Sequence, residues 1–414
     1  MNLEDLKNKT ILLLGKSRAF SEDEFLSQLQ FHNISVVQEV SDDVLLILEG
    51  RMMSPYEQNL SDALYEEKKF TFMSIDAFEK LLAQEIDNDT LLMSLKLSND
   101  KVRLKSFLQN GCIKDALFFK LLKMYSFNGE DFFENDDNRD VSAALIARFY
   151  ENIERNHNVQ YATTGIYHLI SQTKNEQLLE AIAFLEPSKK HPKIMKALAL
   201  HENIPKSVLK MFLKKGDETL KEAMAYNTNL DKNIARELVK NEYFAAVVAQ
   251  NIKLDDAMFA LLSEYKNSLA HNETLHVTMQ EALFTCNDRS LHLALAANKS
   301  LDSVTCKCLL DMQDEAINNA IYANPATAKE ILQQAYKEGD YKEALSQNSA
   351  TPQEILQELA QSEDEHILLN LAKNENTPVD VLYQLQLDSR FERAIKTNKA
   401  FGKYIQSENI GWLV

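Results

Sequence analysis

The stretch QNSATPQEILQEL, residues 347–359, is followed 26 residues later by KNENTPVDVLYQL, residues 373–385. The two segments share an asparagine, a Thr-Pro pair and the spacing of their apolar residues. Threonine is a common N-cap, and proline is favoured at the first helical position, where no backbone N–H is needed. We therefore predict that Thr351 and Thr377 cap two equivalent helices through their hydroxyl oxygens.

The shared asparagine marks a repeat that runs through the C-terminal half of the chain. Eight asparagines recur at separations of 21 to 26 residues, with His201 in the equivalent place before them: Asn227, Asn251, Asn272, Asn298, Asn324, Asn348, Asn374 and Asn398. A nearly fixed period in this range is typical of a solenoid, in which each unit packs only against its neighbours. We expect the asparagine to end a helix, where it tolerates left-handed backbone geometry, or to bond the neighbouring turn.

Each repeat carries two apolar stripes, one on either side of its asparagine. After Asn348 come Ile355 and Leu359, and before it come Tyr341 and Leu345. Residues four apart lie on one face of a helix, so each repeat is predicted to be a pair of short helices. Stacking then buries the faces that a single pair leaves exposed. The pattern predicts an all-α solenoid of helical-pair repeats, each of about 24–26 residues.

The segments NENTPVDVLYQL and NSATPQEILQEL resemble the leucine-rich repeat variant family, and the resemblance is clear over residues 201–400. It implies a right-handed superhelix in which α and 3₁₀ helices alternate. The 26-residue repeats indicate a longer second helix, closer to a HEAT-like pair. Some members carry an N-terminal iron–sulfur cluster, but this chain has no cysteine cluster there. We predict regular repeats over residues 201–414 and irregular helical repeats over residues 90–200.

An acidic stretch without helical period interrupts the irregular repeats. Asp131, Phe132, Phe133 and Glu134 lie within it. A solvated loop is the simpler interpretation, because runs of charge usually serve only solvation. The alternative is an acidic docking segment that exposes Phe132 and Phe133 to a protein partner.

The first 84 residues differ from the rest, because strand-like apolar runs alternate there with helix-like stretches. The strand-like runs are TILLLG, ISVVQEV, DVLLILEG and FTFMS. Their order with the helices, βαββαβα, predicts a small α/β domain over residues 1–86. Gly15-Lys16-Ser17 looks like half of a phosphate-binding P-loop, but Thr10 stands where the companion glycine is required. We therefore expect no nucleotide hydrolysis.

The element order, the Gly-Lys-Ser run, the helix start FSEDEF and the ending SIDAFEKLL resemble a BRCT domain over about residues 8–84. The chain departs from that family at two places. His32-Asn33 replaces the usual Gly-Gly after the first helix, and Phe78 replaces the tryptophan common in the last helix.

The BRCT resemblance implies binding of phosphopeptides or DNA ends. The phosphate would be bound by a Ser or Thr after the first strand and by a Lys in the second helix. Ser17, flanked by Lys16 and Arg18, matches the first role, but the second helix, residues 55–67, has no Lys or Arg. We therefore expect an incomplete phosphate pocket, in which these three residues are vestigial phosphate or partner contacts. Protein–protein packing is the expected use of the domain.

Composition narrows the classes of function. The chain has 62 acidic and 45 basic side chains and a net charge of −17, which disfavours nucleic acid as a partner. Its four cysteines, including the C-x-C pair Cys306 and Cys308, lack zinc-site spacing, so we expect no metal and no cofactor. No apolar run reaches the length of a membrane span, and the N-terminus lacks a signal-peptide core. A cytoplasmic protein is expected.

These observations favour a non-enzymatic protein-interaction scaffold whose concave solenoid surface holds a protein partner. The BRCT resemblance points to bacterial DNA maintenance, by analogy of fold alone. One alternative is a HEAT-like DNA-binding protein or DNA glycosylase, which needs a basic, aromatic-lined groove and a catalytic Asp. Another is a motility or secretion scaffold unrelated to DNA. The sequence has no G-x-S-x-G or H-E-x-x-H motif, and no catalytic residue is predicted.

Overall fold

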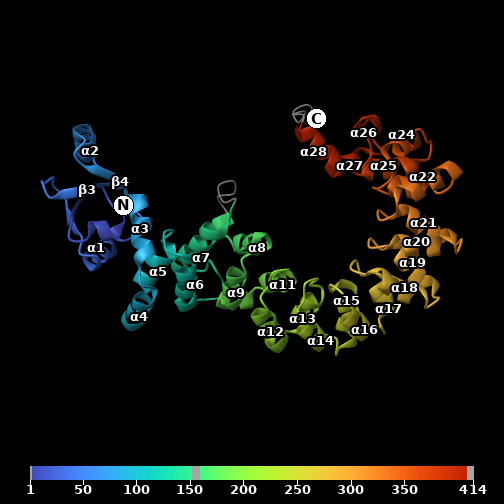
Figure 1. The fold of residues 1–414 in the computed structure, drawn as a ribbon, viewed down its shortest axis with the longest axis horizontal. Coiled ribbons are helices and arrows are strands. Elements are labelled where there is room, and N and C mark those ends of the chain that lie inside the picture. Colours follow the sequence, from blue (N-terminus) through green and yellow to red (C-terminus); the bar gives the residue numbers. More distant parts are fainter. Residues whose placement is uncertain (1, 130, 152–158, 408–414) are drawn as a thin grey trace. The chain divides into compact units, whose positions relative to one another are not determined.

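The computed structural model describes residues 2–129, 131–151 and 159–407 (Figure 1). The chain divides into two compact units, Met1–Met211 and Phe212–Val414. The first unit contains an α/β domain followed by helices, and the described part of the second is built from α-helices. The predicted combination of an α/β domain with an all-α region is therefore confirmed.

The α/β domain is built on a four-stranded parallel sheet with strand order β2-β1-β3-β4. Its elements follow the predicted order βαββαβα after a 3₁₀ turn at Leu3–Leu6: β1 (Thr10–Leu14), α1 (Glu22–Phe31), β2 (Ser35–Val37), β3 (Val44–Glu49), α2 (Pro55–Glu67), β4 (Thr71–Ser74) and α3 (Ile75–Glu85). The central strands β1 and β3 are the most apolar ones, as expected for parallel strands covered on both faces.

Serine residues begin the three helices of this domain. The hydroxyls of Ser21, Ser54 and Ser74 each accept a hydrogen bond from the backbone N–H three residues later. Ser54 also forms a capping box with Glu57 at the start of α2. Helix α2 then packs through Leu64 into an apolar cluster with residues of β1 and β3. These local signals explain why the helix positions could be predicted closely.

The rest of the first unit is helical. Its described helices are α4 (Asn88–Ser98), α5 (Lys101–Gln109), α6 (Asp115–Met124), α7 (Asp136–Phe149), α8 (Thr163–Gln172), α9 (Glu176–Phe184), α10 (Glu186–Lys190) and α11 (Pro192–Leu200). Arg103 of α5 forms an ion pair of 2.8 Å with Glu24 of α1. Phe107 of α5 meets Phe20 edge-on, with ring centroids 6.3 Å apart. The α/β domain thus packs against the first helices, and independent folding of residues 1–86 stays a prediction.

Helix α12 (Lys206–Lys215) contains the boundary between the units, and the second unit continues as a stack of helix pairs. The first helix of a pair follows the repeat asparagine: α14 (Lys232–Leu238), α16 (Asp256–Leu261), α18 (Val277–Phe284), α20 (Ser303–Leu310), α22 (Lys329–Glu338), α24 (Gln353–Leu359) and α26 (Val379–Gln386).

The second helix of a pair precedes the next asparagine. These helices are α13 (Glu218–Ala225), α15 (Glu242–Asn251), α17 (Lys266–Ala270), α19 (Arg289–Ala297), α21 (Glu315–Ala323), α23 (Lys342–Gln347), α25 (Glu365–Lys373) and α27 (Glu392–Lys396), with α28 (Lys399–Ser407) after the last pair. From α13 to α27, successive second helices pack directly on one another. Both helices of each pair are α-helices, whereas the family resemblance implied alternation with 3₁₀ helices.

Six consecutive repeat asparagines, all buried, form a row that we call the asparagine ladder, and each of them is a rung: Asn272, Asn298, Asn324, Asn348, Asn374 and Asn398. The Nδ2 of each donates to two carbonyls of the preceding repeat. For Asn348 these are the carbonyls of Tyr322 at 2.9 Å and Asn324 at 2.7 Å. The last carbonyls of a helix have no partner within that helix. Each rung therefore supplies hydrogen-bond donors to the C-terminal end of the second helix in the preceding repeat.

The backbone of the ladder differs from the expectation. Asn348 has φ −77° and ψ 118°, which is extended, so the prediction of left-handed geometry is wrong. The predicted bond to the neighbouring turn is confirmed, because Oδ1 of Asn348 accepts from the N–H of Ala350 at 2.7 Å. The amide thereby uses its donors across the repeat boundary and its acceptor within its own turn.

The threonines of the Thr-Pro pairs also act differently from the prediction. The hydroxyl of Thr351 donates to the carbonyl of Leu345 at 2.7 Å, and Pro352, without any side-chain cap, is the N-cap of α24. Thr377 likewise donates backwards, to Leu371 at 2.7 Å. Thr351 is fully buried, so its hydroxyl needs a partner, and α23 ends beside it with free carbonyls. The N-cap prediction is therefore wrong: these threonines complete the preceding helix.

From Asn272 to Asn398, the length of a repeat follows the length of its second helix. Rungs 26 residues apart end at Asn298, Asn324 and Asn374, after second helices of nine residues. Rungs 24 residues apart end at Asn348 and Asn398, after second helices of six and five residues. The predicted lengthening of the second helix is confirmed, and the bonds of the ladder are the same in both cases.

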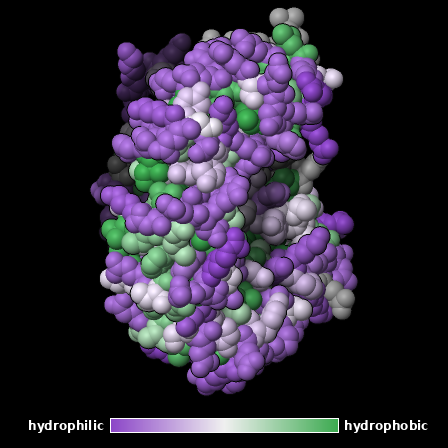
Figure 2. Space-filling view, turned by 90° about the vertical axis from the view of Figure 1, so that its right-hand side faces the viewer, coloured by the Kyte–Doolittle hydropathy of each residue, from purple (hydrophilic) through white to green (hydrophobic). Residues whose placement is uncertain are grey.

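Hydrophilic residues cover most of the face drawn in Figure 2, and hydrophobic residues form scattered small areas on it. Across the residues that the structure describes, no helix combines the length and the apolar character needed to span a bilayer.

Candidate functional site

The loop after β1 holds the predicted phosphate or partner contacts. The backbone N–H of Lys16 donates to the carbonyl of Arg51 at 2.7 Å, which joins this loop to the one between β3 and α2. The hydroxyl of Ser17 donates to the carbonyl of Phe20 at 3.0 Å. The side chains of Lys16 and Arg18 are exposed. Ser17 therefore stabilises its own loop, and the structure brings the two cations to the surface beside it.

Carboxylates from two helices occupy the backbone donors of this loop. Oε1 of the fully buried Glu79, on α3, accepts from the N–H groups of Arg18 at 2.9 Å, Ala19 at 2.9 Å and Phe20 at 3.2 Å. Successive backbone N–H groups of this kind form an anion-binding hollow in many proteins. Here a side chain of the protein itself fills it.

Glu57 does the same at the start of the loop. Its Oε1 accepts from the N–H of Gly15 at 2.9 Å, and its Oε2 accepts from the N–H of Ser54 at 2.6 Å. The bond from Gly15, followed by those from Ser54, lowers the pKa of Glu57. The capping box of α2 therefore also anchors the loop after β1.

The arginines near this loop are paired as well. Arg18 and Arg51 both reach Asp76, at 3.3 Å and 2.8 Å. Desolvation opposes the ionisation of Asp76, but the hydrogen bonds and charges of the two arginines outweigh it and lower the pKa of Asp76. A phosphate group would have to displace Glu79 from the backbone and Asp76 from the arginines.

Sequence reasoning found Lys16, Ser17 and Arg18 but missed Glu57, Asp76 and Glu79. The missed residues lie 42 to 61 residues from their partners in the loop. Glu57 stands three residues after Ser54, the spacing of a capping box, yet nothing local indicated its second bond, to Gly15. Each of the three carboxylates stands in the first or second turn of a helix, and that position was the only sequence signal.

The predicted acidic docking segment is part of the interior on one side. Phe132 is fully buried, meets Phe127 edge-on and stacks on His191, so the expectation that it is exposed is wrong. Asp131 accepts from the hydroxyl of Thr163 at 3.0 Å. Phe133 is half-buried and Glu134 is exposed. The charged residues suggested a solvated loop, but packing against α7, α8 and α11 decides its conformation.

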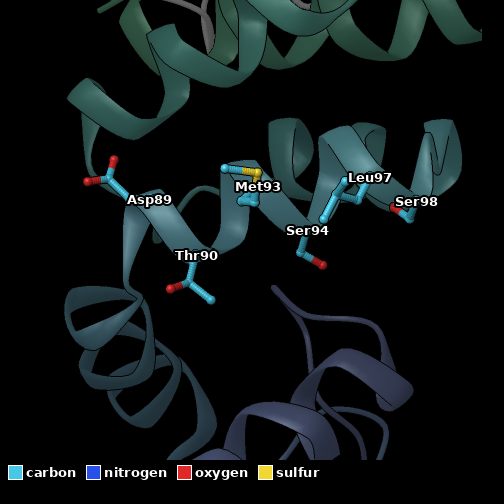
Figure 3. A pocket seen from close by; sticks show the side chains of 6 residues that line it. All are labelled: Asp89, Thr90, Met93, Ser94, Leu97 and Ser98. Carbon is cyan, nitrogen blue, oxygen red and sulfur yellow. The ribbon is translucent and has the colours of Figure 1, made fainter.

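An open hollow lies along α4, lined by Asp89, Thr90, Met93, Ser94, Leu97 and Ser98. Figure 3 shows Met93 and Leu97 on one side of the helix and Thr90 and Ser94 on the other. Met93 and Leu97 are exposed, and Ser94 accepts a hydrogen bond of 2.9 Å from Arg103. Polar groups from different elements converge in most catalytic pockets. This hollow is lined by a single helix, so it offers no such arrangement.

The second helices of the second unit expose a surface of distinct composition. Beyond the first residue of each helix, every exposed or half-buried residue of α15, α17, α19 and α21 is uncharged: Tyr243, Ala246, Val247, Gln250, Asn251, Asn267, Ser268, Ser290, Leu293, Ala297, Ala316, Asn318, Asn319, Ala320 and Ala323. We call these residues the uncharged face. The hydroxyl of Ser290 on α19 donates to Oδ1 of Asn267 on α17, in the neighbouring repeat, at 3.4 Å, and each of the four helices packs on the next.

Three of the four first helices of the same repeats carry exposed charge beyond their first residue. These residues are Arg236 and Glu237 of α14, Glu281 of α18 and Lys307 of α20, whereas α16 has none. The first residues of the four helices, Glu242, Lys266, Arg289 and Glu315, are charged, so the absence of charge is a property of the positions after them, in a chain with 26% charged residues. The sequence contains this lack of charge, because the repeat fixes which residues lie on the second helices. It becomes visible only once the exposed positions of those helices are known.

Elsewhere in the part of the chain that the structure describes, the arrangement of histidines, cysteines and carboxylates is a test for metal binding. Within the described residues, no group of three or more His, Cys, Asp or Glu side chains is placed to hold a metal ion. Cys306 is buried, and burial raises the pKa of its thiol to about 11, whereas Cys308 is exposed on the same helix. The two thiols of the C-x-C pair therefore face different surroundings.

Comparison of the chain with models of known protein families, with curated proteins and with solved structures finds no match.

Proposed function

We propose that this protein is a non-enzymatic scaffold that binds a protein partner on the uncharged face of its second unit. The observation that carries the proposal is the composition of that face, which lacks charge in a chain of net charge −17. Depletion of charged residues is a property of the core of protein–protein interfaces. Stacked repeats supply such a surface without needing a pocket.

The α/β domain fits the same function. Its element order and parallel sheet support a BRCT-like assignment, and the repeats support a leucine-rich repeat variant or HEAT-like one. Because Glu79 and Glu57 occupy the loop donors, we propose that Lys16, Ser17 and Arg18 form protein contacts and do not bind phosphate. We place the scaffold in the cytoplasm, with bacterial DNA maintenance as its setting by analogy of fold.

Site-specific photo-crosslinking in the native cell tests the proposal. A photoreactive residue at Leu293 or Asn319 on the uncharged face is expected to capture one protein at high yield. The matched control places the same residue at Glu281 or Lys307 on the first helices, where capture is expected to be weak. Leu293→Glu, combined with the crosslinker at Asn319, should abolish capture, because a buried unpaired charge opposes binding.

Equal capture from the first helices and from the second helices would contradict the proposal that the partner binds the uncharged face. Capture of nucleic acid, or a salt-dependent shift with DNA in electrophoresis, would favour the DNA-binding or glycosylase alternative. Capture of a motility or secretion component would keep the scaffold and replace its setting.

A further inference from the structure

His201, at the C-cap of α11, stands in the repeat position that asparagine takes in the second unit. Its Nδ1 accepts a hydrogen bond of 3.1 Å from the backbone N–H of Asn203, two residues later. A ladder asparagine makes the same bond through Oδ1. On its other side the ring bonds to the backbone of Thr173 and Ile170, at the end of α8. His201 is therefore a rung of the same kind, placed in the first unit.

The chemistry of this rung differs from that of an amide. A neutral imidazole has one donor nitrogen and one acceptor nitrogen. Because Nδ1 accepts from Asn203, the proton lies on Nε2, which donates towards the preceding repeat. A protonated imidazole has two donors and no acceptor, so its Nδ1–H would point at the N–H of Asn203. The asparagine amide does not change its protonation state when an imidazole does. The asparagine rungs therefore keep both their hydrogen-bond donor and their hydrogen-bond acceptor.

We propose that His201 is a pH-sensitive rung, whose protonation opens the turn between α11 and α12 while the asparagine ladder of the second unit stays closed. The turn depends on this residue twice. Besides the bond to Asn203, the carbonyl of His201 accepts from the N–H of Ile204 at 3.2 Å. Ile204 is buried at the entrance to α12.

The surroundings of the ring set the direction of the effect. Burial lowers the pKa of His201, against the opposing charge of Glu202, the next residue. Lys174, after the rung partner Thr173, and Lys206, at the start of α12, are the cationic residues of the adjoining segments. A lowered pKa means that the folded state binds the proton less well than the unfolded state. The contribution of the rung is therefore complete above about pH 6.5 and is lost as pH falls below it.

Hydrogen exchange on the full chain at pH 7.5 and pH 5.5 tests this proposal, with rates corrected for intrinsic exchange at each pH. The wild type should lose protection at Asn203 and Ile204 by about threefold or more at the lower pH. His201→Asn supplies a rung that does not titrate, so its protection should be equal at both values. His168→Asn removes an exposed histidine of α8 and should behave like the wild type.

Three results would overturn the proposal. One is a pH dependence in His201→Asn equal to that of the wild type. Another is a ring titration by nuclear magnetic resonance in which the pKa of His201 lies at or above the ordinary histidine value of about 6.5. If His201→Asn instead loses protection at both pH values, the ring and the amide are not equivalent, and the rung assignment is wrong.

Discussion

The α/β domain and the helical stack differ in which backbone groups need a side-chain partner: N–H groups in the domain and carbonyls in the stack. In the α/β domain, the loop after β1 exposes backbone N–H groups, and the carboxylates of Glu57 and Glu79 accept from them. In the stack, the second helices end in free carbonyls, and the amides of the asparagine ladder donate to them. Carboxylates titrate and occur here once each, whereas amides do not titrate and recur six times, from Asn272 to Asn398. The stability of the loop after β1 therefore depends on two individual residues, whereas the stability of the helical stack depends on an asparagine that recurs along it.

The largest effect is expected from Glu79→Ala. The change leaves three buried or half-buried N–H groups without their acceptor, at a cost of about 4 kcal/mol of unfolding free energy. Urea unfolding of the first unit measures the loss, and hydrogen exchange should place it at residues 15–20. Glu66→Ala, at an exposed position of α2, is the control and should be neutral. Loss of protection spread equally over both units would contradict the local dependence.

Asn348→Asp should come next. It keeps the shape of the side chain but replaces two donor bonds with a negative oxygen facing the carbonyls of Tyr322 and Asn324, at about 3 kcal/mol. Exchange should rise in the repeats on both sides of the rung. The control is Asn319→Asp, where the same change falls on an exposed side chain. A stack that tolerates both changes equally would mean that the ladder adds nothing to stability.

Thr351→Val should have a smaller effect. It removes one hydrogen bond, to the carbonyl of Leu345, at almost constant volume, so about 1 kcal/mol is expected. Exchange should increase at the end of α23. If it increased at the start of α24 instead, the threonine would be an N-cap after all.

Lowering the pH should affect the stability of the loop after β1 and that of the helical stack differently, without any mutation. The pKa of Glu57 is lowered by the bond from Gly15, so the stability that it contributes is present above its unfolded pKa of about 4.5 and is lost as pH falls through the lower folded value. The loop after β1 should therefore lose protection below about pH 4.5, while the rungs from Asn272 to Asn398 keep theirs. Simultaneous loss at both places would show that the ladder depends on surface carboxylates.

Lys16→Ala should change least. The side chain is exposed, so the change in stability should stay within about 0.5 kcal/mol. We also expect purified protein to hydrolyse no nucleoside triphosphate, before or after this change. A hydrolysis rate that Lys16→Ala abolishes would refute the non-enzymatic scaffold.

Local signals made the fold predictable. The alternation of strand-like and helix-like runs marked the elements of the α/β domain, and the asparagine period marked the repeats, because both depend on residues close in sequence. What failed depended on partners further away. The burial of Phe132 comes from His191, 59 residues later, and the hydroxyl of Thr351 prefers a carbonyl behind it to the N–H groups ahead. The loop after β1 looked like a phosphate site because Glu79 cannot be assigned to it from sequence.

The ladder also has a consequence for the history of the chain. Each rung bonds only the repeat before it, and the bonds are the same whether 24 or 26 residues intervene. A gene segment that encodes one repeat therefore carries its own means of attachment. Duplication or loss of such a segment, by unequal crossing-over between similar stretches, lengthens or shortens the stack without requiring a new interface. Natural variants of this architecture can differ in repeat number, and an engineered chain can be resized by the same operation.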